Sequence, residues 1–405
     1  MDVFLARQPI LNKFNKLFGY ELLFRDSERD ILQCENRDIA TIEVIKNNFT
    51  NIGIEQVTGD KKAFIKFTEN ILKSDIFSIL PLELVVVEIA DDIEPSNDIL
   101  EICKKLKARG YLIALDSFIY SEKYRKLIEF VGIIKVDFKI TKGDERKKVI
   151  EKVNSPNIRF IAEKIETLEE FNEAVSDGYS YFQGCYFIRP SINTGEKLSE
   201  NKIICMKLFQ QISSDSYNLD SIENLIKRDI ALSLKLLKLI NSATYCFVNE
   251  IRSMKQALAL LGEKELKNWF YVLILKTLGE DKPEIIIINS LIRAKFAESI
   301  AVRFKIGIKP FNAYLLGMLS MVELLLNRPL EEILKELRIP IEVKDALNGI
   351  NNSNNNNNNN SKLLNLLIEY ENGQWDKVSK IAEELNLDEK WLPNAYFEAI
   401  LSSNI

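Results

Sequence analysis

Short apolar runs in the first half of the chain each end in an ionisable side chain. Residues 84–87 run into Glu88, and residues 111–115 run into Asp116. The whole set of such side chains is Glu21, Glu88, Asp116, Lys135, Asp137, Glu163 and Glu166. Hard carboxylate oxygens suit Mg²⁺ or Mn²⁺, and a divalent metal beside a lysine and a spare glutamate can activate water for phosphodiester hydrolysis. Taken singly, each group is equally consistent with a polar residue entering solvent at a strand end.

Other catalytic systems are excluded by composition. The chain has no histidine, no G-K-[ST] loop and no G-x-G-x-x-G motif. Histidine-dependent nucleophiles, histidine general bases and H-E-x-x-H metal sites are therefore absent. Any catalysis must use carboxylates, lysine and a bound metal, and Arg25 could hold a phosphate as a bidentate fork.

Strand patterns alternate with helix patterns through residues 1–195. The strands are expected near residues 3–10, 18–24, 63–67, 84–88, 111–116, 132–137, 159–163 and 181–182. Residues 14–16 are expected to form a hairpin turn between the first two strands. This order predicts a TIM-like parallel α/β barrel, in which the carboxyl ends of the strands converge on one rim.

The sequence becomes helical after residue 195. Apolar residues recur at i, i+3 and i+4 through most of residues 200–405, which predicts a separate all-α domain. Residues 351–360 are almost pure asparagine and are expected to form a mobile loop, because they cannot bury apolar area.

Charge and composition indicate the cellular location of the protein and the classes of partner that it does not bind. The net charge of −5 argues against non-specific nucleic-acid binding, which requires a basic face. The longest apolar run is too short to span a bilayer, and the N-terminus does not resemble a signal peptide. The five cysteines are scattered without a C-x-x-C motif, as in reduced cytosolic proteins. We therefore expect a cytoplasmic protein with no membrane and no nucleic-acid partner.

Five motifs follow one another in order within residues 1–195. They are Gln8-Pro9-Ile10, Glu21-Leu22-Leu23-Phe24-Arg25, Lys135-Val136-Asp137, Ala162-Glu163-Lys164-Ile165-Glu166 and Gln183-Gly184-Cys185-Tyr186-Phe187. In order and spacing they resemble the Q-P-I, E-A-L, K-x-D, A-E-G-V-E and Q-G-Y-x-F motifs of the EAL domain. Members of that family are phosphodiesterases of the bacterial messenger cyclic di-GMP, and the resemblance implies an EAL-type barrel.

The resemblance also implies roles for individual residues. Glu21, Glu88 and Asp116 would be metal ligands, with Asp137 as a fourth, and the metal would be Mg²⁺ or Mn²⁺ if any activity remains. Lys135 would orient the attacking water, and Glu163 and Glu166 would support the metal and the water. The nucleotide would be faced by Gln8, Arg25 and Gln183.

Two departures from the family pattern bear on activity. Lys66 stands where active members place an asparagine metal ligand, and Ser117 stands where they place a second aspartate. An ammonium close to a divalent ion opposes metal binding. We hypothesise that Lys66 acts as a built-in cation in place of the metal; the alternative is that its side chain turns to solvent. The sequence therefore leans toward a barrel that has lost hydrolysis.

The helical half carries a second resemblance. Residues 229–243 and 254–262 are similar to the HDOD domain of bacterial signalling proteins, which is related to the HD superfamily. Residues 315–323 resemble the metal-binding helix of that superfamily, with Ser320 and Met321 in place of its His-Asp pair. We expect these two residues to pack in a core and the HDOD domain to contact a protein partner.

Together these observations predict a bacterial intracellular signalling protein with an inactive EAL domain and a partner-binding HDOD domain. One alternative is an active, metal-dependent cyclic di-GMP phosphodiesterase. A second is a receptor that binds cyclic di-GMP without hydrolysing it, and a third is an interaction module indifferent to nucleotide. Pairing of two barrels through their faces, as the resemblance implies, would give a homodimer.

Overall fold

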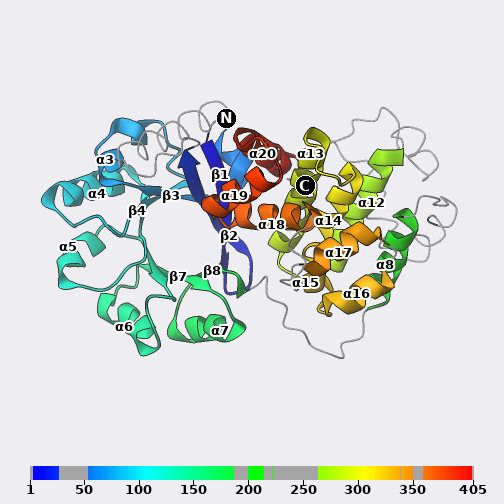
Figure 1. Ribbon diagram of the computed structural model, residues 1–405. Helices are drawn as coiled ribbons and strands as arrows, with labels where there is room; N and C mark the ends of the chain where they lie inside the picture. The colour runs from blue at the N-terminus through cyan, green and yellow to red at the C-terminus, as the bar shows by residue number, and fades with distance from the viewer. Residues whose placement is uncertain are drawn as a thin grey trace, which may run out of the picture. The chain divides into compact units, whose positions relative to one another are not determined.

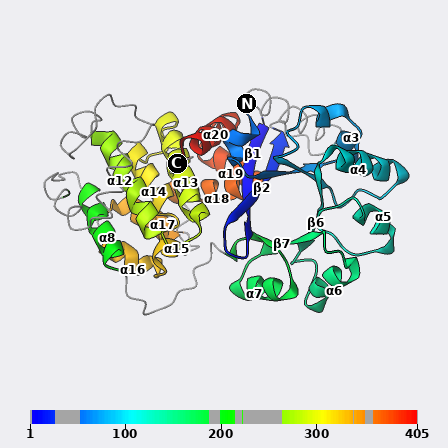
Figure 2. The same cartoon turned by 180° about the vertical axis from the view of Figure 1, so that it is seen from behind.

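Eight strands in the first part of the chain close into a barrel, with helices outside it (Figures 1 and 2). The computed structural model describes residues 3–26, 53–186, 199–213, 222, 263–337, 339–349 and 359–403. The strands are β1 (Val3–Asn12), β2 (Leu17–Asp26), β3 (Lys62–Phe67), β4 (Val85–Ile89), β5 (Leu112–Leu115), β6 (Ile133–Asp137), β7 (Arg159–Ile165) and β8 (Tyr181–Gly184). Their order around the barrel follows their order in the sequence, which confirms the predicted fold class.

The first strand runs against its neighbours, so the barrel is mixed and not wholly parallel. β1 pairs antiparallel with both β2 and β8, whereas β2 to β8 pair in parallel. The physical reason is the short turn between β1 and β2, since parallel neighbours need a crossover connection of a dozen or more residues. Asn12 shapes this turn, because its Oδ1 accepts hydrogen bonds from the backbone N–H groups of Phe14 and Lys16, at 2.9 and 3.0 Å.

Helices follow most of the parallel strands. They are α2 (Ile54–Thr58), α3 (Glu69–Leu72), α4 (Asn97–Arg109), α5 (Arg125–Ile128), α6 (Asp144–Val153) and α7 (Leu168–Asp177). Inside the barrel, one layer of buried apolar side chains fills the centre: Ile10, Phe64, Val86, Ala114, Ile133 and Ile161. The polar side chains of the rim lie directly above this apolar layer.

The remaining described elements are helical. They are α8 (Glu200–Ile212), α12 (Glu263–Leu278), α13 (Glu284–Arg303), α14 (Pro310–Leu319), α15 (Val322–Leu326), α16 (Leu330–Glu336), α17 (Ile341–Gly349), α18 (Asn359–Glu371), α19 (Trp375–Glu384) and α20 (Leu392–Ser403). Among the residues described, no helix is long and apolar enough to cross a membrane. Residues 351–358 of the asparagine tract lie outside the described part, and its last two residues begin α18.

The chain divides into two units at different places from the predicted 1–195 and 200–405. Residues from Asn365 onward, together with Val302–Phe304, group with the barrel, and the second unit comprises Pro190–Ala301 and Lys305–Leu364. The physical reason lies in β1, which pairs with β8 only at Leu11 and Asn12. The rest of that strand edge needs cover, and α20 contacts β1 while the Gln8 side chain donates a hydrogen bond to the Asn372 carbonyl at 3.4 Å. Both views show α19 and α20 next to β1 and β2 (Figures 1 and 2).

Replacing Ile400 with alanine tests this division. Ile400 in α20 is fully buried, so Ile400→Ala should cost about 2–5 kcal/mol and should speed hydrogen exchange in β1 and β2. The matched control is Ile333→Ala in α16, which removes an equally buried isoleucine from the other unit. Ile333→Ala should speed exchange in α14 to α17 and leave β1 and β2 protected. Identical exchange patterns for the two variants would contradict the division.

Candidate functional site

The polar rim of the barrel follows from strand alternation. Successive side chains of a strand point to opposite faces, so a residue two places beyond a core residue points into the same barrel interior. Phe64 precedes Lys66 in this way, and Val86 precedes Glu88. The same spacing relates Ala114 to Asp116, Ile133 to Lys135, Ile161 to Glu163 and Tyr181 to Gln183. The sequence thus places a polar layer directly above the apolar layer.

Lys135 lies at the centre of this polar layer and is fully buried. Its Nζ is 2.6 Å from a Glu163 oxygen, 2.9 Å from Glu88 Oε1 and 3.0 Å from Glu21 Oε2. An Asp116 oxygen lies 3.7 Å away. Four carboxylates, three from β2, β4 and β7 and one directly after β5, therefore surround one ammonium group. We refer to these five residues as the Lys135 cluster.

Burial and charge act against each other within the Lys135 cluster. Burial alone would lower the pKa of Lys135, but the surrounding carboxylates raise that pKa well above its ordinary value. Burial raises the pKa of Glu88 well above its ordinary range despite the nearby ammonium, and Glu88 Oε2 has no hydrogen-bond partner among the described residues. Burial also raises the pKa of Glu163, to about 7. Burial thus favours the neutral acid forms of Glu88 and Glu163, whereas the Lys135 ammonium favours their charged forms.

Lys66 brings a second ammonium to the same site. Its Nζ forms an ion pair with Asp116 Oδ2, while its side chain stays 45% exposed. Although burial opposes the charge, Asp116 raises the pKa of Lys66. Burial likewise opposes ionisation of Asp116, but Lys135 and Lys66 lower its pKa. The Lys66 ammonium therefore lies against a predicted metal ligand instead of extending free into solvent.

A third lysine reaches the rim from β7. Lys164 stands at the glycine position of the A-E-G-V-E motif and has φ +55°, a left-handed conformation that favours glycine. Its Nζ lies 2.6 Å from Asp137 Oδ2. Ser117, which replaces the family's second aspartate, also has positive φ, at +42°. Both substitutions thus sit on unusual backbone conformations at the rim.

Asp137 and Glu166 have other partners than Lys135. One Asp137 oxygen accepts from the backbone N–H groups of Lys139 at 2.7 Å and Ile140 at 3.3 Å, and the other pairs with Lys164. Glu166 pairs with Lys139 near the surface. The structure therefore brings Glu21, Glu88, Asp116 and Glu163 together and leaves Asp137 and Glu166 beside the cluster.

The predicted nucleotide-facing residues adjoin the cluster. Gln183 Nε2 donates to Glu21 Oε2 at 2.7 Å and to Gln8 Oε1 at 3.1 Å. Gln183 is buried, and its Oε1 has no hydrogen-bond partner among the residues described. Arg25 lies in β2 opposite Phe4, and its side chain is outside the described part of the structure.

The chemistry of this arrangement does not fit a divalent metal. The oxygens of Glu21, Glu88 and Asp116 converge on ammonium groups, which occupy the place a cation would take. Within the described ranges no group of three or more acidic or cysteine side chains is arranged to hold a metal ion.

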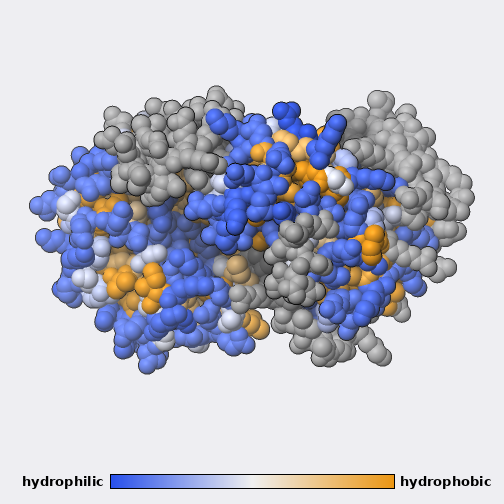
Figure 3. All heavy atoms as spheres, in the orientation of Figure 1, coloured by the Kyte–Doolittle hydropathy of each residue, from blue (hydrophilic) through white to orange (hydrophobic). Residues whose placement is uncertain are grey.

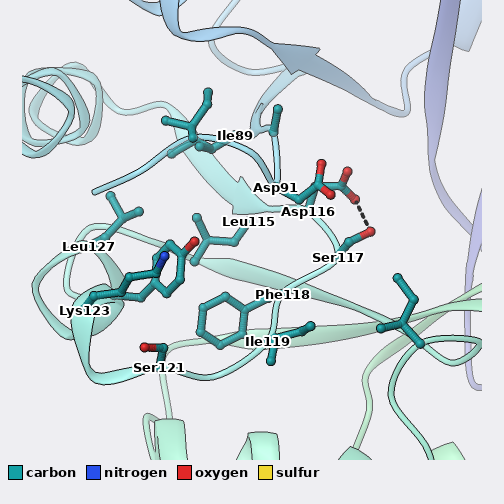
Figure 4. Close-up of a pocket in the computed structure, with 14 residues that line it drawn as sticks. Ile89, Asp91, Leu115, Asp116, Ser117, Phe118, Ile119, Ser121, Lys123 and Leu127 are labelled. Atoms are coloured by element: carbon teal, nitrogen blue, oxygen red, sulfur yellow. Dashed lines mark hydrogen bonds between the residues drawn. The ribbon is translucent and has the colours of Figure 1, made fainter. Parts of the chain in front are cut away.

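A pocket beside the cluster was not foreseen from the sequence. It has a volume of about 430 Å³ and is lined by residues that follow β4 and β5, among them Asp91, Asp116, Phe118 and Tyr124. Figure 4 shows Asp91, Asp116 and Ser117 toward one side in that view, Lys123 and Leu127 toward the other, and the Phe118 ring between them. Sequence patterns give no signal for such a pocket, because it depends on the path of the loop after Asp116.

In the helical part, Met321 packs in the core as predicted, whereas Ser320 is only partly buried. Met321 is buried, and Ser320 Oγ donates to the Gly317 carbonyl at 2.7 Å and accepts from Arg293 Nη1 at 3.1 Å. The HDOD-like segments 229–243 and 254–262 lie outside the described residues.

The barrel topology and the carboxylate rim define an EAL-like barrel joined to a helical region. The family model described as the HDOD domain matches residues 201–347. YuxH of Bacillus subtilis is 36% identical over 408 residues, covering 99% of this chain and 98% of YuxH. The cyclic di-GMP phosphodiesterase CdgJ of Vibrio cholerae is 32% identical over 388 residues, covering 95% of this chain and 88% of CdgJ.

Among solved structures, Klebsiella pneumoniae BlrP1 in a calcium and cyclic di-GMP complex matches with a TM-score of 0.39 and 19% identity, covering 45% of this chain and 54% of that one. The chain belongs to the family of signalling proteins that join an EAL-like domain to an HDOD domain.

Replacing Lys135 and Lys66 one at a time should separate the contributions of the two ammonium groups to the free energy of unfolding. Lys135→Met should lower the free energy of unfolding by about 3–5 kcal/mol, because it leaves buried carboxylates without their cation. Lys66→Met should cost less than about 1 kcal/mol, because the Lys66 side chain is 45% exposed and Asp116 keeps Lys135 as a second cation. Chemical denaturation of both variants measures the difference, and equal losses would contradict the central position of Lys135.

Proposed function

We propose that this chain is a cyclic di-GMP signalling protein whose barrel binds the messenger without hydrolysing it. The observation that carries the proposal is the ion pair between Lys66 and Asp116, at the place where a catalytic metal would sit. A divalent cation about 4 Å from an ammonium group is repelled by about 8 kcal/mol at an effective dielectric of ~20. Metal binding would therefore require Lys66 to leave Asp116.

The ligand-facing side of the site supports binding. Gln8 and Gln183 lie within hydrogen-bond distance of each other, next to Glu21. Gln183 Oε1 is a buried acceptor without a partner among the described residues, and such a group is satisfied when a ligand supplies an N–H or O–H donor. We propose that Gln8, Gln183 and Arg25 contact the nucleotide and that Lys135, Glu163 and Glu166 are vestiges of a catalytic set.

Calorimetric titration with cyclic di-GMP, in EDTA and in Ca²⁺, tests this function. We expect saturable binding of equal affinity in both conditions, because Lys66 supplies the positive charge without metal. Binding that requires Ca²⁺ would contradict the metal-free receptor. The absence of binding in both conditions would leave the barrel as an interaction module.

Changing Lys66 to asparagine tests the built-in cation directly. Lys66→Asn removes the ammonium and supplies a neutral oxygen ligand, so the affinity for Mn²⁺ should rise by at least about tenfold. The matched control is Lys62→Asn at the start of the same strand, where the lysine is bonded to the Glu83 carbonyl. Unchanged Mn²⁺ affinity in Lys66→Asn would show that Lys66 does not replace the metal.

A metal-dependent phosphodiesterase is the second candidate function. It is favoured by Glu88 Oε2, a buried carboxylate oxygen that has no partner in the described part and that a cation would satisfy. The relative CdgJ is named a cyclic di-GMP phosphodiesterase. Mg²⁺- or Mn²⁺-dependent release of the linear dinucleotide by the unmodified protein would establish this function and overturn the receptor.

We further propose that the helical region contacts a protein partner. The support is that Ser320 is hydrogen-bonded and Met321 is buried, at the two positions where the resemblance implies a His-Asp pair. A domain without that metal site retains its surfaces for binding.

A further inference from the structure

The pocket beside the Lys135 cluster has no role in the function proposed so far. It opens where β4 and β5 end, and Asp116 lines it while also belonging to the cluster. The loop that forms one wall is fixed by backbone hydrogen bonds: Phe118 N–H donates to the Lys135 carbonyl at 2.8 Å, and Asp116 N–H donates to the Ile89 carbonyl at 3.1 Å. A ligand seated over the cluster therefore has a formed cavity directly beside it.

The walls of the pocket suit a flat, largely apolar ring. Ile89, Leu115, Phe118 and Leu127 supply apolar and aromatic surface, and Phe118 packs edge-on against Tyr124 with ring centroids 5.5 Å apart. The volume of about 430 Å³ lies in the range of small-molecule sites. Ile119, which also lines the pocket, is 61% exposed although it is apolar. Hydrophobic surface is visible on the part of the barrel that carries α5 and α6 (Figure 3).

One polar group at the pocket has no partner of its own. Asp91 is exposed, lines the pocket and makes no hydrogen bond or ion pair with any described residue. By contrast, Asp116 is already paired with Lys66 and Lys135. A carboxylate offers only acceptors, so it selects a ring that presents two neighbouring N–H donors.

We propose that this pocket binds a guanine-type base, with its apolar walls against the ring and Asp91 accepting from the N1–H and the amino group. Adenine presents a ring-nitrogen acceptor beside its amino group, and the carboxylate would repel that acceptor. The inference rests on the proposed function, since it assigns one base of a cyclic dinucleotide to this cavity. It makes Asp91 a specificity-determining residue for guanine over adenine.

Methyl NMR of the full chain with labelled isoleucines locates the binding. Guanosine, adenosine, cyclic di-GMP and cyclic di-AMP are titrated separately in EDTA. We expect guanosine and cyclic di-GMP to shift the methyl signals of Ile89 and Ile119, and the two adenine compounds to bind at least tenfold more weakly. Asp91→Asn should weaken guanosine and cyclic di-GMP binding at least tenfold, because its amide group faces one of the donors. Asp92→Asn is the matched control, since Asp92 is also exposed but does not line the pocket.

The outcomes separate this inference from the proposed function. If Asp91→Asn binds cyclic di-GMP with unchanged affinity, or if binding leaves the methyl signals of Ile89 and Ile119 unshifted, the base pocket is overturned. The proposal that the protein is a cyclic di-GMP receptor is then unaffected. Guanosine binding that requires Asp91 without any binding of cyclic di-GMP supports the pocket and overturns the receptor. Equal binding of guanosine and adenosine, or binding of neither, overturns the pocket.

Discussion

A fully buried ammonium group, that of Lys135, is the constraint on which the upper half of the barrel depends. An isolated buried charge is costly, and it is tolerated only where opposite charges and hydrogen bonds compensate it. Here the compensation comes from β2, β4, β5 and β7 at once. The four carboxylates would in turn repel one another without the lysine. Strands that lie far apart in the sequence are thereby held in one register by a single side chain.

The same electrostatic reasoning links the two other lysines of the rim. Lys66 compensates Asp116, and Lys164 compensates Asp137, each with one ammonium against one buried carboxylate. A divalent metal offers such compensation with higher charge and with open coordination positions for substrate and water. Ammonium groups neutralise the carboxylates but cannot polarise a phosphate or lower the pKa of water as a metal does. The rim therefore sets ammonium groups against carboxylates that the family resemblance implies as metal ligands.

Features of the fold and the site could be predicted from the sequence where they depend on residues close together in the chain, and not where they depend on segments far apart. The polar layer was predictable because strand alternation is local and places Glu88 and Asp116 above Val86 and Ala114. The reversed direction of β1 was implicit in its short turn. The cover of β1 by α20 was not predictable, since helical periodicity shows that a helix has an apolar face but not which surface receives it. The pocket at Asp91 was missed because it depends on loop geometry, and the pairing of Lys164 with Asp137 was missed because it depends on the left-handed backbone of Lys164.

The cover of β1 also shapes how the molecule is made. The hydrogen bond from Gln8 to the Asn372 carbonyl joins residues 364 positions apart. Contacts between residues so far apart in the sequence form late in folding, because the entropic cost of closing a long loop must be met before the contact adds stability. β1 is synthesised early, but α20, which covers its open edge, is synthesised only after the intervening unit. An unpaired strand edge is prone to pair with other chains, so the C-terminal segment that covers β1 also removes a site of association between copies of the chain.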